Sequence, residues 1–281
     1  MTNHTKPTLV IGGTGKTGRR VAERLEQRGI PARIGSRSAD PPFDWDDIHT
    51  WAPALEGARA AYISYYPDIA IPGAVEAVTA LAATALDQGV RRLVLLSGRG
   101  EEEAQRAERA VRESGADWTI VRCSWFSQNF SEGHFAEQIA AGELVLPATS
   151  VPEPFVDVED IADVAALALT EDGHEGQVYE LTGPRMLTFE EAVGEVAAAA
   201  GREIRYVPVT SEEFAAGARA QGVPDEIVEF LIYLFAEVLD GRNASLTDGV
   251  QRALGRKPRD FSQYAREAAA AGVWNDPAGV G

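Results

Sequence analysis

A glycine-rich stretch near the N-terminus, IGGTGKTG at residues 11–18, has the composition of a phosphate-binding turn. Its glycines fit both the G-x-x-G-x-x-G and the G-x-G-x-x-G spacing. Such glycines let the backbone approach a phosphate at the N-terminus of a helix. The stretch also ends like a Walker A loop, but that motif needs a glycine where this chain has Val10. A nucleoside triphosphate site is therefore not predicted.

The sequence around this stretch places it between a strand and a helix. Residues 8–12 form a short apolar run typical of a buried strand, residues 19–29 have helical spacing, and residues 30–37 form a second β-like run. This order is the unit that binds the pyrophosphate of a dinucleotide. We therefore expect the turn to bind a pyrophosphate through Gly12, Thr14, Gly15, Lys16, Thr17 and Gly18.

The end of the second β-like run indicates which dinucleotide is bound. Sites that prefer NAD place a carboxylate there to accept from the ribose hydroxyls, whereas this chain has Ser36 and Arg37. A guanidinium pairs with the 2′-phosphate of NADP, Ser36 can donate to the same phosphate, and Lys16 adds positive charge. The sequence therefore predicts NADP(H) as the cofactor.

Further polar and aromatic residues follow the later strands, and ligands bind beyond the carboxyl ends of strands in open α/β sheets. Tyr65 is interpreted as a proton donor or as a residue that packs against the cofactor, and Ser97 as a donor to a substrate oxygen or as a cap of the next turn. The predicted cofactor site also includes Tyr65, Ser97 and Gly98. The predicted substrate site comprises Trp125, Phe126, Asn129 and Tyr233. The alternative for each of these residues is a role in core packing or in ordering the local backbone.

The elements that position these residues alternate between strand and helix. Strand patterns at 58–65, 91–98 and 117–124 are separated by helical patterns at 73–88 and 101–115. This alternation predicts an α/β fold with a Rossmann doubly wound parallel sheet. We expect an NADP-binding core at 1–150, to which a strand near 177–182 returns, and a smaller, mostly helical substrate-binding region at 151–281. An edge strand in the proline-rich segment 38–47 is expected to be weak or absent.

The C-terminal region contains two helix starts with capping-box spacing, Thr188 with Glu191 and Thr210 with Glu213, and one strand pattern at 203–209. A helix predicted over 224–241 is apolar on almost every side near its centre. Such a helix is buried, lines a cavity or forms a subunit contact, and a homodimer is consistent with the last of these.

The composition excludes several classes of function. The 281 residues carry 43 acidic and 26 basic side chains, a formal charge of −17, and polyanions are bound by basic faces, so no direct nucleic-acid partner is expected. The single cysteine, Cys123, lies in a strand pattern and is expected to be buried and inert. No metal-ligand spacing, signal peptide or membrane span is evident, which predicts a cytoplasmic, metal-free protein. The aromatic and hydroxyl side chains that follow the later strands predict a small aromatic or conjugated substrate.

Four stretches together carry a family resemblance: GGTGKTG, Ser97 at a strand end, ADWTIVRCSWFSQNF at 116–130 and FVDVEDIADVA at 155–165. With them the chain resembles the NmrA-like branch of the atypical short-chain dehydrogenase/reductases, and SWFSQNF is similar to the matching stretch of bacterial NADPH:quinone oxidoreductases. The resemblance implies a Rossmann core, NADP(H) binding and a C-terminal substrate region. The branch contains reductases of quinones and phenolic ethers and also redox-sensing regulators.

The chain departs from better-known relatives in one respect. They use Tyr-x-x-x-Lys, in which the lysine lowers the pKa of the tyrosine for proton transfer, but residues 101–115 contain neither tyrosine nor lysine, and Gln105 stands near the place of the lysine. Quinone reduction needs less acid–base catalysis by the protein. The favoured hypothesis is an NADPH-dependent reductase of a small quinone or conjugated carbonyl compound. The alternatives are a non-catalytic NADP(H) sensor acting through a protein partner, and a biosynthetic dehydrogenase or isomerase.

Overall fold

The structure, a computed structural model, describes residues 6–147 and 149–275. The chain divides into two compact units. Unit 1 consists of Met1–Cys123, Val158–Leu181 and Asp248–Arg256, and unit 2 consists of Ser124–Asp157, Thr182–Thr247 and Lys257–Gly281. Because six segments alternate, the chain passes between the units five times, and no single boundary in the sequence separates them.

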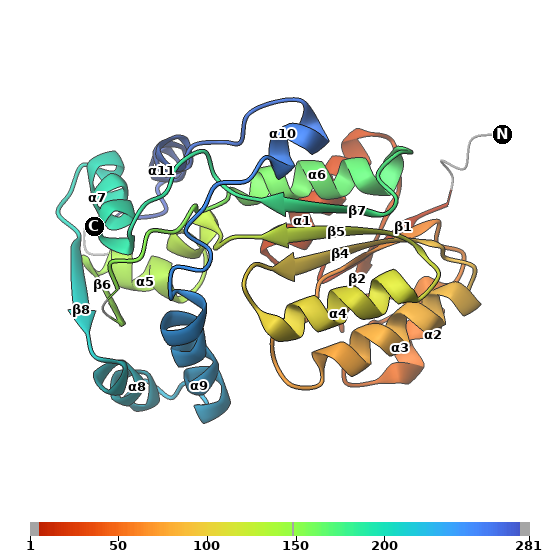
Figure 1. Cartoon of the computed structure of the whole chain (residues 1–281), viewed down its shortest axis with the longest axis horizontal. Helices are drawn as coiled ribbons and strands as arrows, with labels where there is room; N and C mark the ends of the chain where they lie inside the picture. Colours follow the sequence, from red (N-terminus) through yellow and green to blue (C-terminus); the bar gives the residue numbers. More distant parts are fainter. Residues whose placement is uncertain (1–5, 148, 276–281) are drawn as a thin grey trace. The chain divides into compact units, whose positions relative to one another are not determined.

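Unit 1 is built on a six-stranded parallel sheet (Figure 1) in the order β2-β1-β3-β4-β5-β7. This confirms the predicted doubly wound α/β fold, and the strand expected near 177–182 pairs with β5. Among the described residues 38–47 no strand is present, and β2 forms the edge of the sheet. The strands are β1 (Thr8–Ile11), β2 (Ala32–Gly35), β3 (Ala60–Ile63), β4 (Arg92–Gly98), β5 (Asp117–Cys123) and β7 (Gln177–Leu181).

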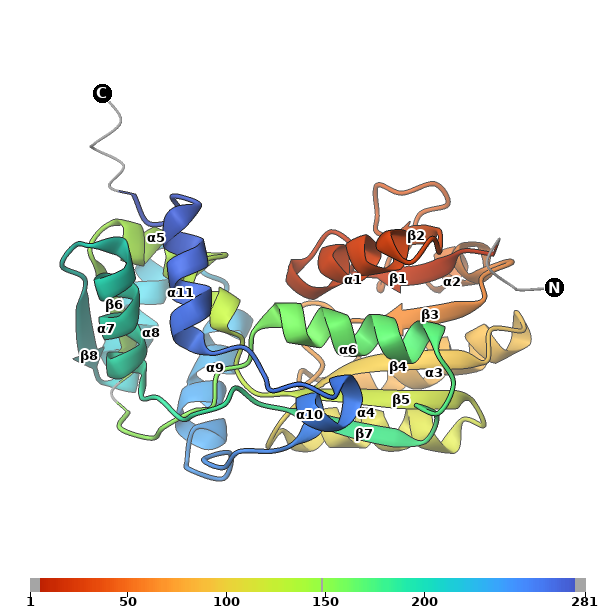
Figure 2. The same cartoon turned by 90° about the horizontal axis from the view of Figure 1, so that it is seen from above.

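Helices cover both faces of this sheet, as the views in Figures 1 and 2 show. α1 and α6 pack together on one face, α3 and α4 pack together on the other with α2 beside α3, and α10 lies against β7 and α6. Two covered faces explain why β1 and β3 are buried throughout, since neither face of these strands meets water. The helices are α1 (Lys16–Gln27), the 3₁₀ helix η1 (Ile48–Thr50), α2 (Trp51–Leu55), α3 (Ala74–Asp87), α4 (Glu102–Glu113), α6 (Val158–Thr170) and α10 (Gly249–Leu254).

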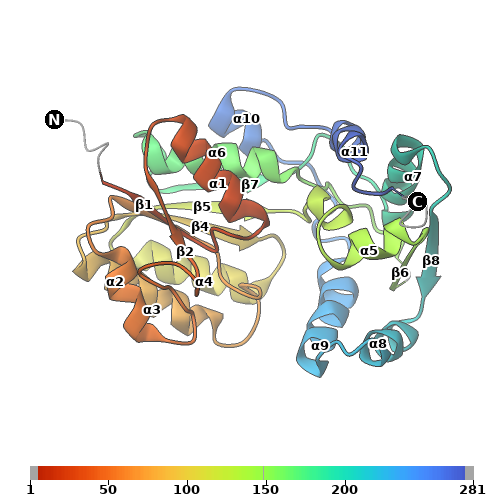
Figure 3. The ribbon, with the colours of Figure 1, turned by 180° about the vertical axis from the view of Figure 1, so that it is seen from behind.

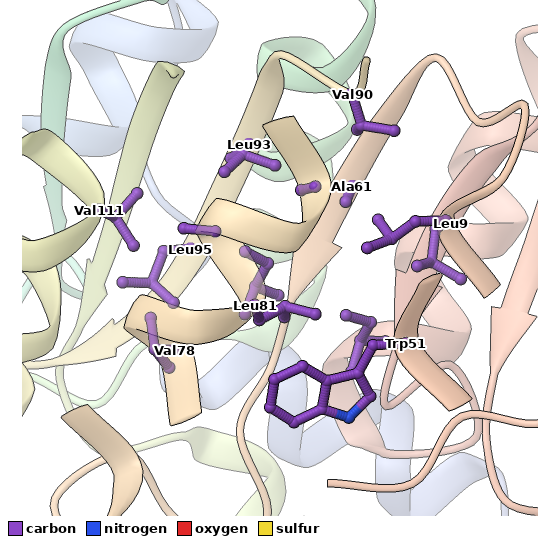
Figure 4. Close-up of a cluster of buried hydrophobic side chains, with 14 of the residues drawn as sticks. Leu9, Trp51, Ala61, Val78, Leu81, Val90, Leu93, Leu95 and Val111 are labelled. Atoms are coloured by element: carbon purple, nitrogen blue, oxygen red, sulfur yellow. The ribbon is translucent and has the colours of Figure 1, made fainter. Parts of the chain in front are cut away.

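The core of unit 1 on the α2, α3 and α4 side is a continuous apolar cluster (Figure 4). Leu9, Leu81 and Leu93 are at most 1% exposed, and Trp51 closes the cluster beside them. Each leucine contributes about 1.5–3 kcal/mol when fully buried. This packing holds the strands whose carboxyl ends carry the predicted cofactor residues.

Charged side chains fix α1, the helix that follows the glycine turn, against α6. Arg20 Nε lies 2.6 Å from Glu159 Oε1, Arg24 Nε lies 2.8 Å from Asp163 Oδ1, and Arg24 also pairs with Glu159. All four side chains are partly buried, so these pairs are screened less than surface pairs. The N-terminus of α1 is therefore held from the side by a second helix.

Unit 2 contains the remaining helices and a two-stranded parallel sheet, β6 with β8 (Figure 3). Both predicted capping boxes are present, and the strand predicted at 203–209 is β8. The elements are the 3₁₀ helix η2 (Ser127–Phe130), α5 (His134–Ala140), β6 (Glu143–Pro147), α7 (Phe189–Ala200), β8 (Arg205–Val209), α8 (Ser211–Ala220), α9 (Asp225–Tyr233), the π-helical turn η3 (Leu234–Val238) and α11 (Phe261–Ala270).

In unit 2, two sequence patterns differ from the structure and one strand was not expected. The apolar start of the stretch EPFVDVEDIADVAALAL at 153–169 is typical of a short strand before a helix, but Glu153 and Val156 form isolated bridges, because their partners are single residues of two different segments. The helix expected over 224–241 ends at Tyr233 and continues as the π-helical turn η3. β6 was not predicted, because it is a five-residue run that ends in a proline and pairs with a strand some sixty residues away.

Two findings concern ligands and membranes. In the described part of the chain, no helix has both the length and the hydrophobicity needed to cross a bilayer. Within residues 6–147 and 149–275, no group of three or more His, Cys, Asp or Glu side chains is arranged to hold a metal ion.

Candidate functional site

The glycine turn between β1 and α1 is closed by its own backbone. Gly15 N donates to Gly12 O at 2.9 Å, and Gly12 adopts φ 70°, a left-handed conformation suited to glycine. A Cβ on Gly18 would lie 2.2 Å from Gly12 O, so only glycine fits where the helix passes the turn. α1 begins at Lys16 without a side-chain cap, since its N-cap residue is Gly15. An uncapped helix start behind a glycine turn is the arrangement that binds a phosphate.

The structure brings the ends of three strands together around Gly12. Gly12 N donates to Gly35 O at 3.0 Å, which links the turn to the end of β2, and the Cβ position of Gly12 lies 3.3 Å from Ser64 Cβ, beyond β3. The predicted cofactor residues of these three segments therefore share one corner of unit 1. Thr14 and Gly15 are exposed there, Lys16 is half-buried, and Thr17 is buried.

Arg37 is exposed at this corner, two residues past the end of β2. Among the residues that the structure describes, its guanidinium has no hydrogen bond or ion pair. The neighbouring Ser36 hydroxyl lies 3.3 Å from that of Ser38, and its carbonyl accepts from Phe43 N at 2.9 Å, which fixes the backbone of the loop. In a chain with a formal charge of −17, an arginine without a carboxylate partner can pair with an anionic ligand.

Tyr65 follows β3 and packs on an aromatic side chain, Trp45, that is not among the predicted site residues. Its ring centroid lies 4.7 Å from that of Trp45, whose indole nitrogen donates to Ser64 O at 3.3 Å. Burial, with the charges of Asp46 and Glu76, raises the pKa of the Tyr65 phenol. The phenol therefore stays protonated at neutral pH and is a hydrogen donor rather than a base. An aromatic residue between two turn segments, as in DPPFDWDD, was the available signal for Trp45.

Ser97 lies at the carboxyl end of β4, level with Tyr65 by the register Ile63↔Leu95. Its hydroxyl is buried and donates to Glu108 Oε1 of α4 at 2.7 Å. The hydrogen atom of Ser97 is thus committed to a carboxylate. A role for Ser97 toward substrate stays a prediction that this geometry does not favour. Next to it, a Cβ on Gly98 would lie 2.3 Å from the Glu101 carboxylate, so a larger residue there would require the Glu101 side chain to shift.

Glu108 belongs to a charged network that the sequence did not reveal. Arg122 Nε of β5 donates to Glu108 Oε1 at 2.8 Å, and Arg122 Nη1 donates to Glu180 Oε2 of β7 at 3.2 Å. Arg99 Nε completes the chain with a 2.7 Å bond to Glu180 Oε1. The hydrogen bond from Arg122 to Glu108 raises the pKa of the arginine. The network ties α4 to β4, β5 and β7 behind the strand ends.

The four predicted substrate residues all lie in unit 2. The Trp125 ring has its centroid 5.4 Å from that of Phe189 and 5.2 Å from that of Phe235. Phe126 pairs with Val156 in a parallel bridge, and Asn129 lies within η2 and is half-buried. Trp125 and Phe126 are also half-buried.

Tyr233 lies at the end of α9, with its ring stacked on Phe230 at 6.5 Å, and is half-buried. Phe235, two residues further on in η3, touches the Trp125 ring. The aromatic cluster of unit 2 therefore joins Trp125 to the turn that follows Tyr233. Cys123 of unit 1 is 4% exposed, which confirms the expected burial, and this burial raises the pKa of its thiol.

Comparison with known proteins finds a match to the family model described as NAD(P)H-binding over residues 12–172. The chain is 32% identical over 280 residues to the uncharacterized oxidoreductase YesF of Bacillus subtilis, covering 95% of this chain and 96% of that protein. It is 30% identical over 285 residues to the NAD(P)H azoreductase of Xenophilus azovorans, covering 94% of this chain and 98% of that protein.

Among solved structures, the chain is similar to the NADPH-dependent quinone oxidoreductase QOR2 of Escherichia coli in complex with NADPH. The TM-score is 0.75 at 20% sequence identity, and the match covers 93% of this chain and 99% of that chain. At this level of identity the likeness establishes the fold.

Proposed function

The chain belongs to the NAD(P)H-binding protein family, and from this premise we propose that it is an NADPH-dependent reductase of small quinones or other conjugated, electron-poor compounds. Unit 1 binds the cofactor in this proposal, and unit 2 supplies the residues that contact the substrate.

The exposed Arg37 is the observation that carries the choice of cofactor. It lies beside a glycine turn whose helix start has no side-chain cap. The turn residues hold the pyrophosphate, and Arg37 with Ser36 holds the 2′-phosphate that distinguishes NADPH from NADH. When bound, NADPH supplies a hydride, which is two electrons and one proton.

The chemistry left to the protein is positioning rather than acid–base catalysis. α4 contains neither tyrosine nor lysine, and Ser97 is bonded to Glu108. A quinone that accepts a hydride becomes a phenolate, which takes its remaining proton from water or from a neutral donor. Tyr65, protonated at neutral pH, is our candidate for that donor. Holding the substrate in line with the nicotinamide is then the main contribution to rate.

The aromatic side chains of unit 2 support a flat, conjugated substrate. Trp125 and Phe126 are both half-buried, and aromatic rings favour offset or edge-on contacts with another aromatic ring. The names of the two characterised relatives, an azoreductase and a quinone oxidoreductase, point to the same class of compound.

The test is to mix the purified protein with NADPH and a panel of benzoquinones, naphthoquinones and azo dyes. We expect oxidation of NADPH that depends on the acceptor and on enzyme concentration. NADPH binding without oxidation by any acceptor would contradict the proposal. The affinities for NADP⁺ and NADPH would then be measured, because the sensor hypothesis requires them to differ.

A further inference from the structure

The segment SWFSQNF, which carries three of the four predicted substrate residues, is attached to the segment ending in Asp157 by backbone hydrogen bonds. Val156 N donates to Trp125 O, and Ser127 N donates to Val156 O, both at 2.9 Å. These two bonds flank Phe126, so Val156 holds the backbone on both sides of this residue.

A side-chain contact extends the attachment beyond the bridge. Gln128 Nε2 donates to Asp157 Oδ1 at 2.6 Å. Both residues are buried: Gln128 is 4% exposed and Asp157 is 2% exposed. The backbone carbonyl of Gln128 also accepts from Glu132 N at 2.8 Å at the end of η2. The position of Gln128 therefore sets the position of η2, which includes Asn129.

The Asp157 carboxylate is itself held from the opposite side. Arg259 Nε donates to Asp157 Oδ2 at 2.7 Å, and another nitrogen of the same guanidinium binds Glu267 of α11. Each carboxylate oxygen thus has a different donor, one neutral and one cationic. A buried carboxylate between two donors has a single favourable orientation, because rotating it breaks a charge-assisted bond in a site with little water.

From the sequence alone, Asp157 and Asp160 fit a turn and a helix start, whereas this contact gives Asp157 a long-range role. Its partners lie 29 and 102 residues away in the chain, and the contact serves the segment of Trp125 and Phe126. The next aspartate of the same motif, Asp160, is as deeply buried but pairs with Arg256 within unit 1. The motif FVDVEDIADVA therefore carries two buried carboxylates with separate tasks.

We propose that Asp157 and Gln128 are positioning residues of the substrate site: the hydrogen bond between them fixes the segment that presents Trp125, Phe126 and Asn129 to a conjugated substrate. This inference rests on the proposed function for the identity of the ligand. It adds the residues that determine the shape of the substrate wall.

Asp157→Asn tests the proposal, because the variant keeps the shape of the side chain but turns an NH₂ group toward one of the two donors. We expect the KM for a naphthoquinone to rise about tenfold, since small displacements of positioning groups have effects of this size or larger. The Kd for NADPH, which is bound by unit 1, stays within about twofold. A purely structural defect would instead lower the active fraction, and so the apparent kcat, at unchanged KM.

Asp160→Asn is the matched control, since it alters an equally buried carboxylate whose arginine partner belongs to unit 1. It should lower the melting temperature without raising the KM. Gln128→Met is a second test variant in case Asp157→Asn does not fold: it removes the amide donor and leaves the pair between Asp157 and Arg259 intact. It should raise the KM in the same direction.

Equilibrium binding of the naphthoquinone to the NADP⁺ complex, followed by quenching of tryptophan fluorescence, provides a readout that does not require turnover. Weaker binding by both test variants at unchanged cofactor affinity supports the inference. Wild-type quinone binding and KM retained in Gln128→Met and in any folded Asp157→Asn would overturn it and leave the proposed function standing. A wild-type protein that neither binds nor reduces the quinone would overturn both.

Discussion

Replacing Arg37 with alanine should separate the two nicotinamide cofactors. The side chain is exposed and has no partner among the described residues, so its removal leaves the fold intact and changes the free energy of unfolding by less than about 0.5 kcal/mol. A hydrogen bond between a guanidinium and a phosphate contributes about 1.5–3 kcal/mol. Since about 1.4 kcal/mol corresponds to a tenfold change, the Kd for NADPH should rise about 10- to 150-fold. The Kd for NADH should change by less than about twofold.

The assay is titration of each reduced cofactor, with nicotinamide fluorescence as the signal, at low and at moderate ionic strength. Added salt should weaken NADPH binding to the wild type more than to the variant, because only the wild type retains the exposed ionic contact. Arg33→Ala is the control, because Arg33 lies on β2, the strand that precedes Arg37. Arg33 Nη1 donates to Ala54 O at 2.8 Å and to Glu56 O at 2.7 Å, so its loss should lower the melting temperature and leave the preference for NADPH unchanged. An equal loss of affinity for both cofactors in Arg37→Ala, or none for either, would refute the assignment of the 2′-phosphate.

Three further predictions concern stability and binding. Gly18→Ala should abolish measurable cofactor binding, because its Cβ would lie 2.2 Å from the Gly12 carbonyl oxygen, and cofactor binding by this variant in a titration would contradict the turn geometry. As its control, Gly194→Ala in the open middle of α7 should raise the melting temperature slightly, as measured by calorimetry. Glu108→Gln should lower the free energy of unfolding by about 2 kcal/mol, since it removes the charge of the nearer of the two carboxylates that pair with Arg122 of β5 and leaves Glu180 as the remaining one; a loss under about 1 kcal/mol in urea would show that Glu180 and water replace the pair. Hydrogen bonds from an arginine hold the pKa of Asp260 well below its usual range, so this carboxylate stabilises the fold above the pKa of an unfolded aspartate and loses that effect as the pH falls. Asp260→Asn should therefore lower the free energy of unfolding by about 1 kcal/mol near neutral pH, a value reduced for partial exposure, and by progressively less in acid. If wild type and variant lost stability equally as the pH falls, the stabilising role of this carboxylate would be refuted.

The features that the sequence predicted correctly depend on local patterns. The strand, glycine turn and helix over residues 8–27 lie within one short stretch, and the alternation of apolar strands with helices predicts the doubly wound sheet. Family membership, predicted from four motifs, is confirmed by the NAD(P)H-binding match. NADP(H) in preference to NADH stays a proposal that depends on Arg37.

The features that the sequence did not predict depend on contacts between distant residues. The pattern of α4 shows a polar helix, and nothing local marks Glu108 as the partner of Ser97 and Arg122. The same holds for Asp157, whose donors come from a 3₁₀ helix before it and from the segment that leads into α11 after it. From the sequence alone, a carboxylate near a helix start is interpreted as a cap, because its long-range donors become visible only in the structure.

The alternation of the two units along the chain has a consequence for biosynthesis. When a ribosome has released only the first part of the chain, up to the end of β6, β5 has no neighbour on one side, because β7 is encoded at 177–181. The nascent sheet therefore has an unpaired edge strand, the kind of surface on which chaperones act and aggregates grow. Unit 1 also includes Asp248–Arg256, so a truncation that stops before these residues removes part of unit 1 as well as part of unit 2.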